Sequence, residues 1–336
     1  MRPAPVTRTK RRRAVPASSE PELSDKGVKP RDNAPLPVTR PPSLGSLFAR
    51  IAAPEPILRI EIVRILAPLA TLGFMSSRLR HADEWLSGVG FQVPEVPGGD
   101  WRQPLYLSPL SPTAAWALAA LMVASGLAVA AGFRARTSAA VFAATLAYVA
   151  LADRLAAFTV SKLSPVVMLA IAASPCGLRF GVDAWRRRRR DPDAPVPELV
   201  AAGGPRFFQV LLPVFYSGSA VAKVHGDWLK EPLVLWTHVH DSYQTAFSWA
   251  LANALPAGVW TALQWLVLAL ELGSPLWFAW RRTRPVALLL AVGMHAMIGL
   301  MFWPVRWFAL LMIAMLLGAF LPAERLTRAA ERVRWA

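Results

Sequence analysis

The sequence predicts an all-α polytopic membrane protein: a bundle of about eight transmembrane helices, with short interfacial loop helices on the non-cytoplasmic side. Three observations predict this class. Of the 336 residues 54% are apolar and only 17% are charged, and the mean hydropathy is +0.37, whereas soluble domains carry about 25% charged residues. The 14 tryptophans indicate contact with a membrane interface, where Trp concentrates. Apolar runs long enough to cross about 30 Å of hydrocarbon recur along the chain.

Residues 1–53 are rich in proline and basic residues and poor in large apolar ones. Such a segment buries too little apolar surface to offset the entropy of ordering, so we expect a disordered cytoplasmic tail. No short apolar core follows the basic run, which argues against a secretory signal. Although the net charge is +16, we expect no nucleic-acid partner, because the other basic clusters flank apolar segments, as orientation in a bilayer requires. Anionic lipid is the partner expected for them.

Eight apolar segments within residues 54–321 are predicted to cross the membrane. The first contains Arg59, Glu61 and Arg64, so we expect it to be buried in the bundle or partly interfacial. The fourth is interrupted by SPCG (174–177), and only Pro304 separates the last two. The predicted spans are Ile57–Met75, Thr113–Phe133, Thr137–Leu155, Ser161–Val182, Arg206–His225, Gly258–Trp280, Pro285–Trp303 and Val305–Leu321.

Every second connection between these segments is basic, which places both termini in the cytoplasm by the positive-inside rule. Residues 322–336 would then form a short basic cytoplasmic helix, and we expect the protein in the cell (inner) membrane. The basic clusters after spans two, four, six and eight are Arg134 and Arg136; Arg186–Arg190; Arg281, Arg282 and Arg284; and Arg325, Arg328, Arg332 and Arg334.

Two segments on the predicted non-cytoplasmic side, Ser76–Pro112 and His225–Pro256, are too long for simple turns. Both are too polar to cross a membrane, and both carry Trp and Tyr residues such as Trp101, Tyr106 and Trp236. We expect them to form short amphipathic helices that cap the bundle.

Three ionisable residues lie in three consecutive predicted spans: Lys223, Glu271 and His295. An ionisable group within hydrocarbon costs roughly 2.5–3.5 kcal/mol, so each one needs a partner or a function. We expect the three to share one polar cavity. Apolar walls disfavour the charged form of a lysine and favour the neutral amine that acts as a base, so Lys223 is the predicted general base, with Glu271 and His295 as further catalytic candidates.

Each of these residues also has a structural explanation. Lys223 can extend its ammonium group to the interface beside Asp227. Glu271 can pair with Arg64 or with a histidine, and His295 can form a hydrogen bond to a neighbouring helix.

Other site chemistries have little support in the sequence. A single cysteine, Cys176, excludes an intrachain disulfide, a CxxC redox motif and a cysteine-based zinc site. No phosphate-binding glycine loop, GxSxG or HExxH motif is present. A metal site at His225, His238, His240 and Asp241 is disfavoured, because HVHD places its two histidines two residues apart, which suits one helix face poorly. We therefore predict no metal.

The stretch YSGSAVAKVHGDW (216–228) resembles the Tyr…Lys…Asp-Trp signature of the HTTM (horizontally transferred transmembrane) domain family, which includes the membrane domain of vitamin K-dependent gamma-carboxylase. The resemblance runs from Pro54 to Leu321. It includes Arg64 in LRIEIVRIL, the GFRARTS turn, FGVDAWRRRRR, the acidic residue of span six and MHAMIGLMF.

In the carboxylase, the resemblance implies, a lysine at the position of Lys223 deprotonates reduced vitamin K. Oxygen converts the quinol to an epoxide, and the strong base formed removes a proton from a glutamate side chain, which captures carbon dioxide. We therefore expect a reduced quinone of the vitamin K or menaquinone type as the cofactor. The residues predicted to bind it are Tyr216, His225, Asp227, Trp228 and Arg64.

Two features depart from the carboxylase pattern. Lys162 occupies the place of a histidine that assists the carboxylase chemistry, and no lumenal β-rich domain follows span eight, so we do not expect carboxylation of a tethered protein.

Two alternatives to a membrane enzyme stay open. One is a non-catalytic lipid or quinone binder, or a subunit that serves a membrane or secreted protein. A second is a small-molecule transporter with helices broken at Pro175, Gly273 and Pro275.

Overall fold

The computed structural model describes residues 45, 49, 52–91, 105, 107–152, 159–240, 244–322 and 326. The chain divides into two units, Met1–Ser43 and Leu44–Ala336, and every helix and strand below belongs to the second. Nearly all of the predicted N-terminal tail and C-terminal helix lie outside the described residues, as do Trp101, Tyr106 and Asp241.

The described part of the second unit is mostly helical, which confirms the all-α class. A helix overlaps each of the eight predicted spans. The helices are α2 (Ile57–Leu79), α3 (Ala82–Leu86), α4 (Pro112–Ala131), α5 (Ala135–Ala152), α6 (Thr159–Ala173), α7 (Val182–Arg190), α8 (Gly203–His225), α9 (Val234–Val239), α10 (Ala246–Ala254), α11 (Ala257–Leu272), α12 (Ser274–Ala279), α13 (Arg284–Met301) and α14 (Arg306–Phe320).

Four of these helices are long and apolar enough to cross a membrane by length and composition: α4, α5, α8 and α13. The number becomes five if α10 and α11, which meet at 115°, form one broken span. Helices α6 and α14 are apolar but shorter, and α2 carries several charges. The chain is thus a protein with several membrane helices, and the figure of eight spans stays a prediction.

Breaks occur where the sequence indicated them. Helix α6 ends at Ala173, directly before the SPCG segment, and α7 begins only at Val182. Gly273 separates α11 from α12, whose first turn contains Pro275. Proline disrupts the preceding turn because it has no N–H to donate and its ring clashes with the carbonyl four residues earlier.

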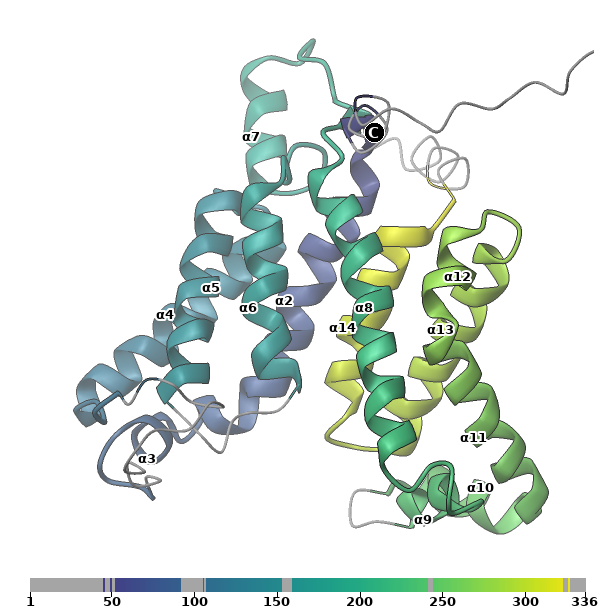
Figure 1. The fold of residues 1–336 in the computed structure, drawn as a ribbon. Helices are drawn as coiled ribbons and strands as arrows, with labels where there is room; N and C mark the ends of the chain where they lie inside the picture. The colour runs from purple at the N-terminus through teal and green to yellow at the C-terminus, as the bar shows by residue number, and fades with distance from the viewer. Residues whose placement is uncertain are drawn as a thin grey trace, which may run out of the picture. The chain divides into compact units, whose positions relative to one another are not determined.

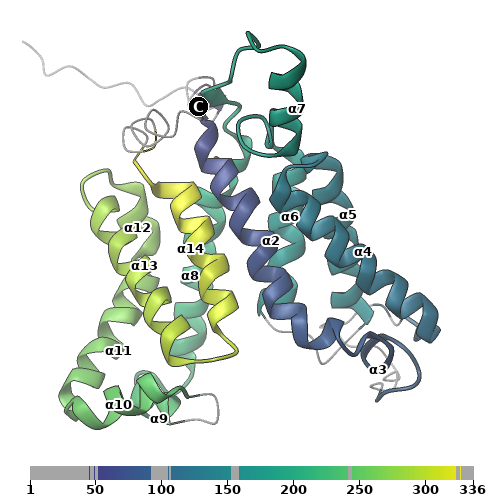
Figure 2. The ribbon, with the colours of Figure 1, turned by 180° about the vertical axis from the view of Figure 1, so that it is seen from behind.

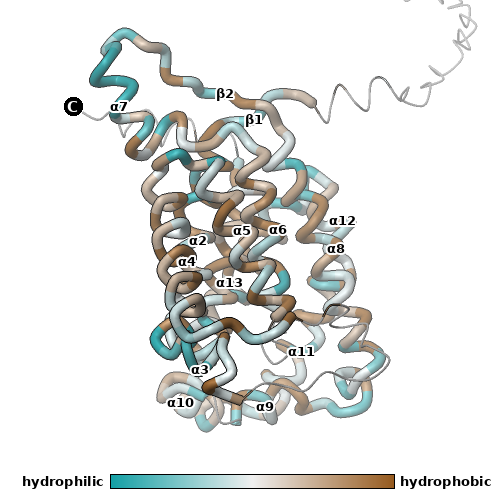
Figure 3. Tube along the Cα trace, turned by 90° about the vertical axis from the view of Figure 1, so that its left-hand side faces the viewer, coloured by the Kyte–Doolittle hydropathy of each residue, from teal (hydrophilic) through white to brown (hydrophobic). Residues whose placement is uncertain are grey.

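Helix α2 lies in the middle of the bundle. Helices α4, α5 and α6 pack on one side of it, and α14, α8 and α11–α13 on the other (Figures 1 and 2). Hydrophobic residues predominate along the long helices, whereas α7 is strongly hydrophilic (Figure 3).

The two ends of the bundle differ. Helix α7 stands at one end, with the short antiparallel pair β1 (Glu55–Pro56) and β2 (Leu199–Val200). The short helices of the two long connections, α3, α9 and α10, lie at the opposite end (Figures 1 and 3). The connections that carry Arg134, Arg186 and Arg281 join helices at the α7 end, so the structure collects these basic residues at one end, as the predicted topology requires.

The charges of α2 are buried, in line with the expectation for the first span. The guanidinium of Arg64 donates to Glu61 at 2.6 Å and to the carbonyl oxygens of Val129 and Ala130 on α4 and of Phe180 in the α6–α7 connection. Glu61 in turn accepts from the backbone N–H of Leu178 at 3.0 Å. The pair therefore satisfies carbonyls at the end of α4 and joins three segments of the chain.

Candidate functional site

Lys223 and Glu271 form an ion pair between α8 and α11. The ammonium nitrogen of Lys223 lies 2.5 Å from each carboxylate oxygen of Glu271 and donates to the hydroxyl of Ser219 at 2.9 Å. The side chain of Glu271 is only 6% exposed, whereas that of Lys223 is 20% exposed. The carboxylate is thus enclosed, whereas the side chain of Lys223 is partly exposed and its nitrogen donates to Ser219 and Glu271.

This pairing decides between the partners considered for Glu271. The prediction that Glu271 pairs with Arg64 is wrong. The guanidinium of Arg64 bonds instead to Glu61 and to backbone carbonyl oxygens of Val129, on α4, and Phe180, which precedes α7. Arg64, predicted to bind a cofactor, lies instead in a buried structural cluster on α2.

His295 on α13 is hydrogen-bonded to Tyr216 on α8. The hydroxyl of Tyr216 lies 2.8 Å from Nε2 of His295, and both residues are buried. The ring of Tyr216 stacks on Phe278 of α12 with centroids 6.3 Å apart, and the imidazole meets the edge of Phe308 of α14 at 5.6 Å. Nδ1 of His295 is buried without a hydrogen-bond partner in the described part of the chain.

The two pairs are neighbours on one face of α8. Tyr216 and Lys223 are seven residues apart, which is about two helical turns, so they project from the same side. The Tyr216–His295 and Lys223–Glu271 contacts therefore lie along one side of α8, about two turns apart.

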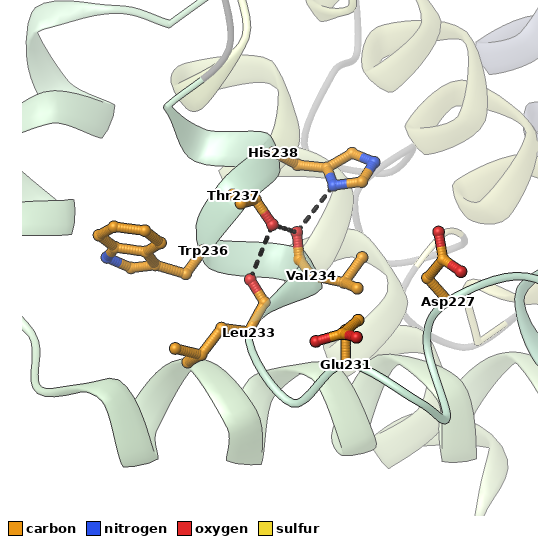
Figure 4. Close-up of a pocket in the computed structure, with 7 residues that line it drawn as sticks. All are labelled: Asp227, Glu231, Leu233, Val234, Trp236, Thr237 and His238. Carbon is orange, nitrogen blue, oxygen red and sulfur yellow. Dashed lines mark hydrogen bonds between the residues drawn. The ribbon is translucent and has the colours of Figure 1, made fainter.

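A pocket of about 570 Å³ opens beyond the end of α8, at the α9 and α10 end of the bundle (Figure 4). The side chains of Asp227, Glu231 and His238 supply its charged and ionisable groups. The remaining lining residues are Leu233, Val234, Trp236 and Thr237. Trp228, which follows Asp227 in the sequence, contacts the ion pair: its ring centre lies 5.0 Å from the Lys223 nitrogen.

Gln264 of α11 holds the connection between α8 and α9 in place. Its amide nitrogen donates to the carbonyls of Trp228 and Glu231 at 2.8 and 2.9 Å, and its oxygen accepts from the N–H of Leu235. Gln264 was not among the residues predicted from the sequence. A side-chain amide within an otherwise apolar helix could have indicated it, because a buried amide needs hydrogen-bond partners.

The histidines outside the bundle interior bond to their own helices. Nδ1 of His225 donates to Val221, that of His238 to Val234 and that of His240 to Trp236, each to the carbonyl four residues earlier. Within the described residues no three His, Cys, Asp or Glu side chains are grouped as metal ligands. Lys162 is exposed in the first turn of α6.

Comparison with known proteins identifies the family. The model of the HTTM domain matches residues 101–323, more than half of the chain. Searches among curated proteins and among solved structures found no match. The matched region contains Lys223, Glu271, His295 and Tyr216. With apolar helices long enough to cross a bilayer, the chain is an integral membrane protein that belongs to the HTTM domain family.

Proposed function

We propose that this protein is a membrane enzyme that uses Lys223 as a general base toward a lipid-soluble, quinol-type molecule. The observation that carries the proposal is the ion pair between Lys223, whose side chain is partly exposed, and the enclosed carboxylate of Glu271.

The pair provides a means of making a neutral amine without creating net charge. Transfer of one proton from Nζ of Lys223 to Glu271, across 2.5 Å, leaves an amine and a carboxylic acid, neither of which is charged. In a medium of low dielectric this neutral state avoids the cost of separated charges. The amine can then accept a proton from an acidic hydroxyl group of a bound molecule.

The residues around Lys223 fit a quinol ring. The Trp228 ring lies 5.0 Å from Nζ, so an aromatic side chain is present beside the amine to contact a lipophilic ring. Trp228 is the residue that would hold the ring. A reduced quinone, when bound, supplies an ionisable hydroxyl and the electrons that it releases on oxidation.

The orientation in the membrane follows from charge. We propose that the α7 end is cytoplasmic, because positively charged connections stay in the cytoplasm, and that the pocket at Asp227 and Glu231 faces the opposite side of the cell (inner) membrane. The proton accepted by Lys223 would then leave toward the non-cytoplasmic side.

The proposal is tested by comparing Lys223→Ala with Arg282→Ala in purified protein supplied with reduced menaquinone and air. Loss of a general base lowers turnover by about 10²–10⁴-fold, so Lys223→Ala should be inactive, while Arg282→Ala, which removes an exposed cation between α12 and α13, keeps the wild-type rate. Thermal unfolding in detergent checks that both variants are folded. A folded Lys223→Ala variant with the wild-type rate would refute the proposal.

A second candidate is a non-catalytic quinone or lipid binder. The Lys223 nitrogen donates hydrogen bonds to Glu271 and Ser219. These bonds favour the second candidate, because a lysine held in this way can serve only to link two helices through an ion pair. Saturable binding of menaquinone without turnover, in wild-type protein, would select this candidate over the enzyme.

A further inference from the structure

Helix α7 carries five consecutive arginines, yet its geometry divides them between two faces. At 100° per residue, Ala184, Arg187 and Arg188 fall on one side, and Trp185, Arg186 and Arg189 on the other. Burial follows the same division: Ala184 is fully buried, whereas Trp185 is 49% exposed.

The inner arginines hold the connection between α6 and α7. Arg187 donates to the carbonyl oxygen of Leu178, and Arg188 donates to that of Arg179 at 3.0 Å. These carbonyls follow the end of α6, where no helical partner is available to them. Arg187 and Arg188 are therefore part of the structure of the connection.

The outer arginines lie on aromatic rings. The guanidinium of Arg189 lies 4.4 Å from the ring centre of Trp185, and that of Arg186 lies 5.1 Å from Phe133, which follows α4 and is 37% exposed. In the described part of the chain no hydrogen bond or ion pair engages either guanidinium. A guanidinium stacked on a ring keeps the N–H groups of its edge available to an anion.

From this arrangement we infer that the outer face of α7, together with Phe133, binds the phosphate group of an anionic phospholipid. Two exposed rings beside two arginines match the boundary between acyl chains and headgroups, where aromatic side chains settle and basic ones reach phosphate. Arginine is suited to the task because its planar fork donates two parallel hydrogen bonds to phosphate oxygens. The inference is independent of the chemistry proposed for Lys223.

The test uses the purified full-length protein in neutral detergent, depleted of lipid. Dioleoyl-phosphatidylglycerol and dioleoyl-phosphatidylcholine are added in turn, and bound lipid is counted by native mass spectrometry, with the shift in melting temperature as a second readout. The variant Arg186→Gln/Arg189→Gln is compared with Arg281→Gln/Arg282→Gln, which removes two exposed arginines at the same end of the bundle.

We expect the wild type to retain phosphatidylglycerol in preference to phosphatidylcholine. Removal of Arg186 and Arg189 should weaken phosphatidylglycerol binding roughly 25-fold, at about five-fold per arginine, while the Arg281/Arg282 variant binds as the wild type does. Equal losses in both variants, or no preference between the lipids, would overturn the inference. Displacement of the lipid by millimolar inorganic phosphate would also overturn it, since the site would then accept soluble phosphate.

Discussion

Gly181 lies directly against Gly132, where the end of α4 meets the start of α7. A β-carbon added to Gly181 would lie 2.8 Å from Cα of Gly132 and 2.7 Å from the carbonyl oxygen of Ala131, and both glycines have positive φ, +119° and +69°. The contact lies beside the guanidinium of Arg64, 3.1 Å from a β-carbon built on Gly132. It therefore controls how closely α7 approaches the charged cluster of α2.

Replacement of Gly181 by alanine should destabilise the protein, because the new methyl group meets backbone atoms and the φ angle suits glycine. We expect a loss of about 1–3 kcal/mol or more in the free energy of unfolding, measured by thermal or denaturant unfolding in detergent. Gly293→Ala is the matched control. It lies within α13 with nothing within 4 Å of the added β-carbon, so it should be neutral or stabilising by up to about 1 kcal/mol. Equal effects at the two positions would contradict this account.

Arg64→Met should be among the most destabilising substitutions on α2. It leaves the carboxylate of Glu61 buried without its cation, at a cost of about 3–5 kcal/mol. Adding Glu61→Leu to this variant should recover part of the stability, because no uncompensated charge is then buried. Arg80→Met, at an exposed arginine after the same helix, should change stability by less than about 0.5 kcal/mol. If the double variant is less stable than Arg64→Met alone, the charge argument fails.

The helices were largely predictable from the sequence, since apolar runs, prolines and glycines report directly on local conformation. That Lys223, Glu271 and His295 each take a hydrogen-bond partner was also predictable, because an ionisable group within a helical bundle needs one. The choice of partner was not. Glu271 had two other reasonable partners, and only the adjacency of α8 and α11 selects Lys223. The structural role of Arg64 could not be predicted for a similar reason. Its guanidinium binds carbonyl oxygens of Val129 and Phe180, which lie far from α2 in the sequence and meet it only in the folded chain.

The number of membrane spans is harder to predict from the sequence than the positions of the helices. Alternating basic clusters predict eight crossings, whereas length and apolarity alone support four or five. The two criteria differ because α6 and α14 are apolar but short, and because a helix shielded by its neighbours, such as α2, can carry charges that a helix in contact with lipid cannot.

Tyr216→Phe tests the link between α8 and α13. The substitution removes the hydroxyl 2.8 Å from His295, leaves both ring nitrogens buried without a protein partner, and should cost about 1–3 kcal/mol of stability. Tyr148→Phe on α5 is the control, because no hydrogen bond engages the hydroxyl of Tyr148 among the described residues. Unfolding in detergent measures both variants. A Tyr216→Phe protein as stable as Tyr148→Phe would mean that the hydrogen bond contributes nothing.

Cys176, in the connection between α6 and α7, should resist thiol reagents in the folded protein. Burial, and then the nearby carboxylate of Glu61, raises the pKa of this thiol to about 11, so at pH 8 almost none of it is the reactive thiolate. Because the folded pKa lies above the unfolded one, the group favours the native state below about pH 9, and this contribution is lost as the pH rises toward 11. We expect iodoacetamide to leave Cys176 unmodified at pH 8 until denaturant is added, with a rate in the native state that increases steeply above pH 9. Rapid labelling at pH 8 without denaturant would show that the α6–α7 connection opens, and would count against the tight packing of Gly132, Gly181 and Arg64 around it.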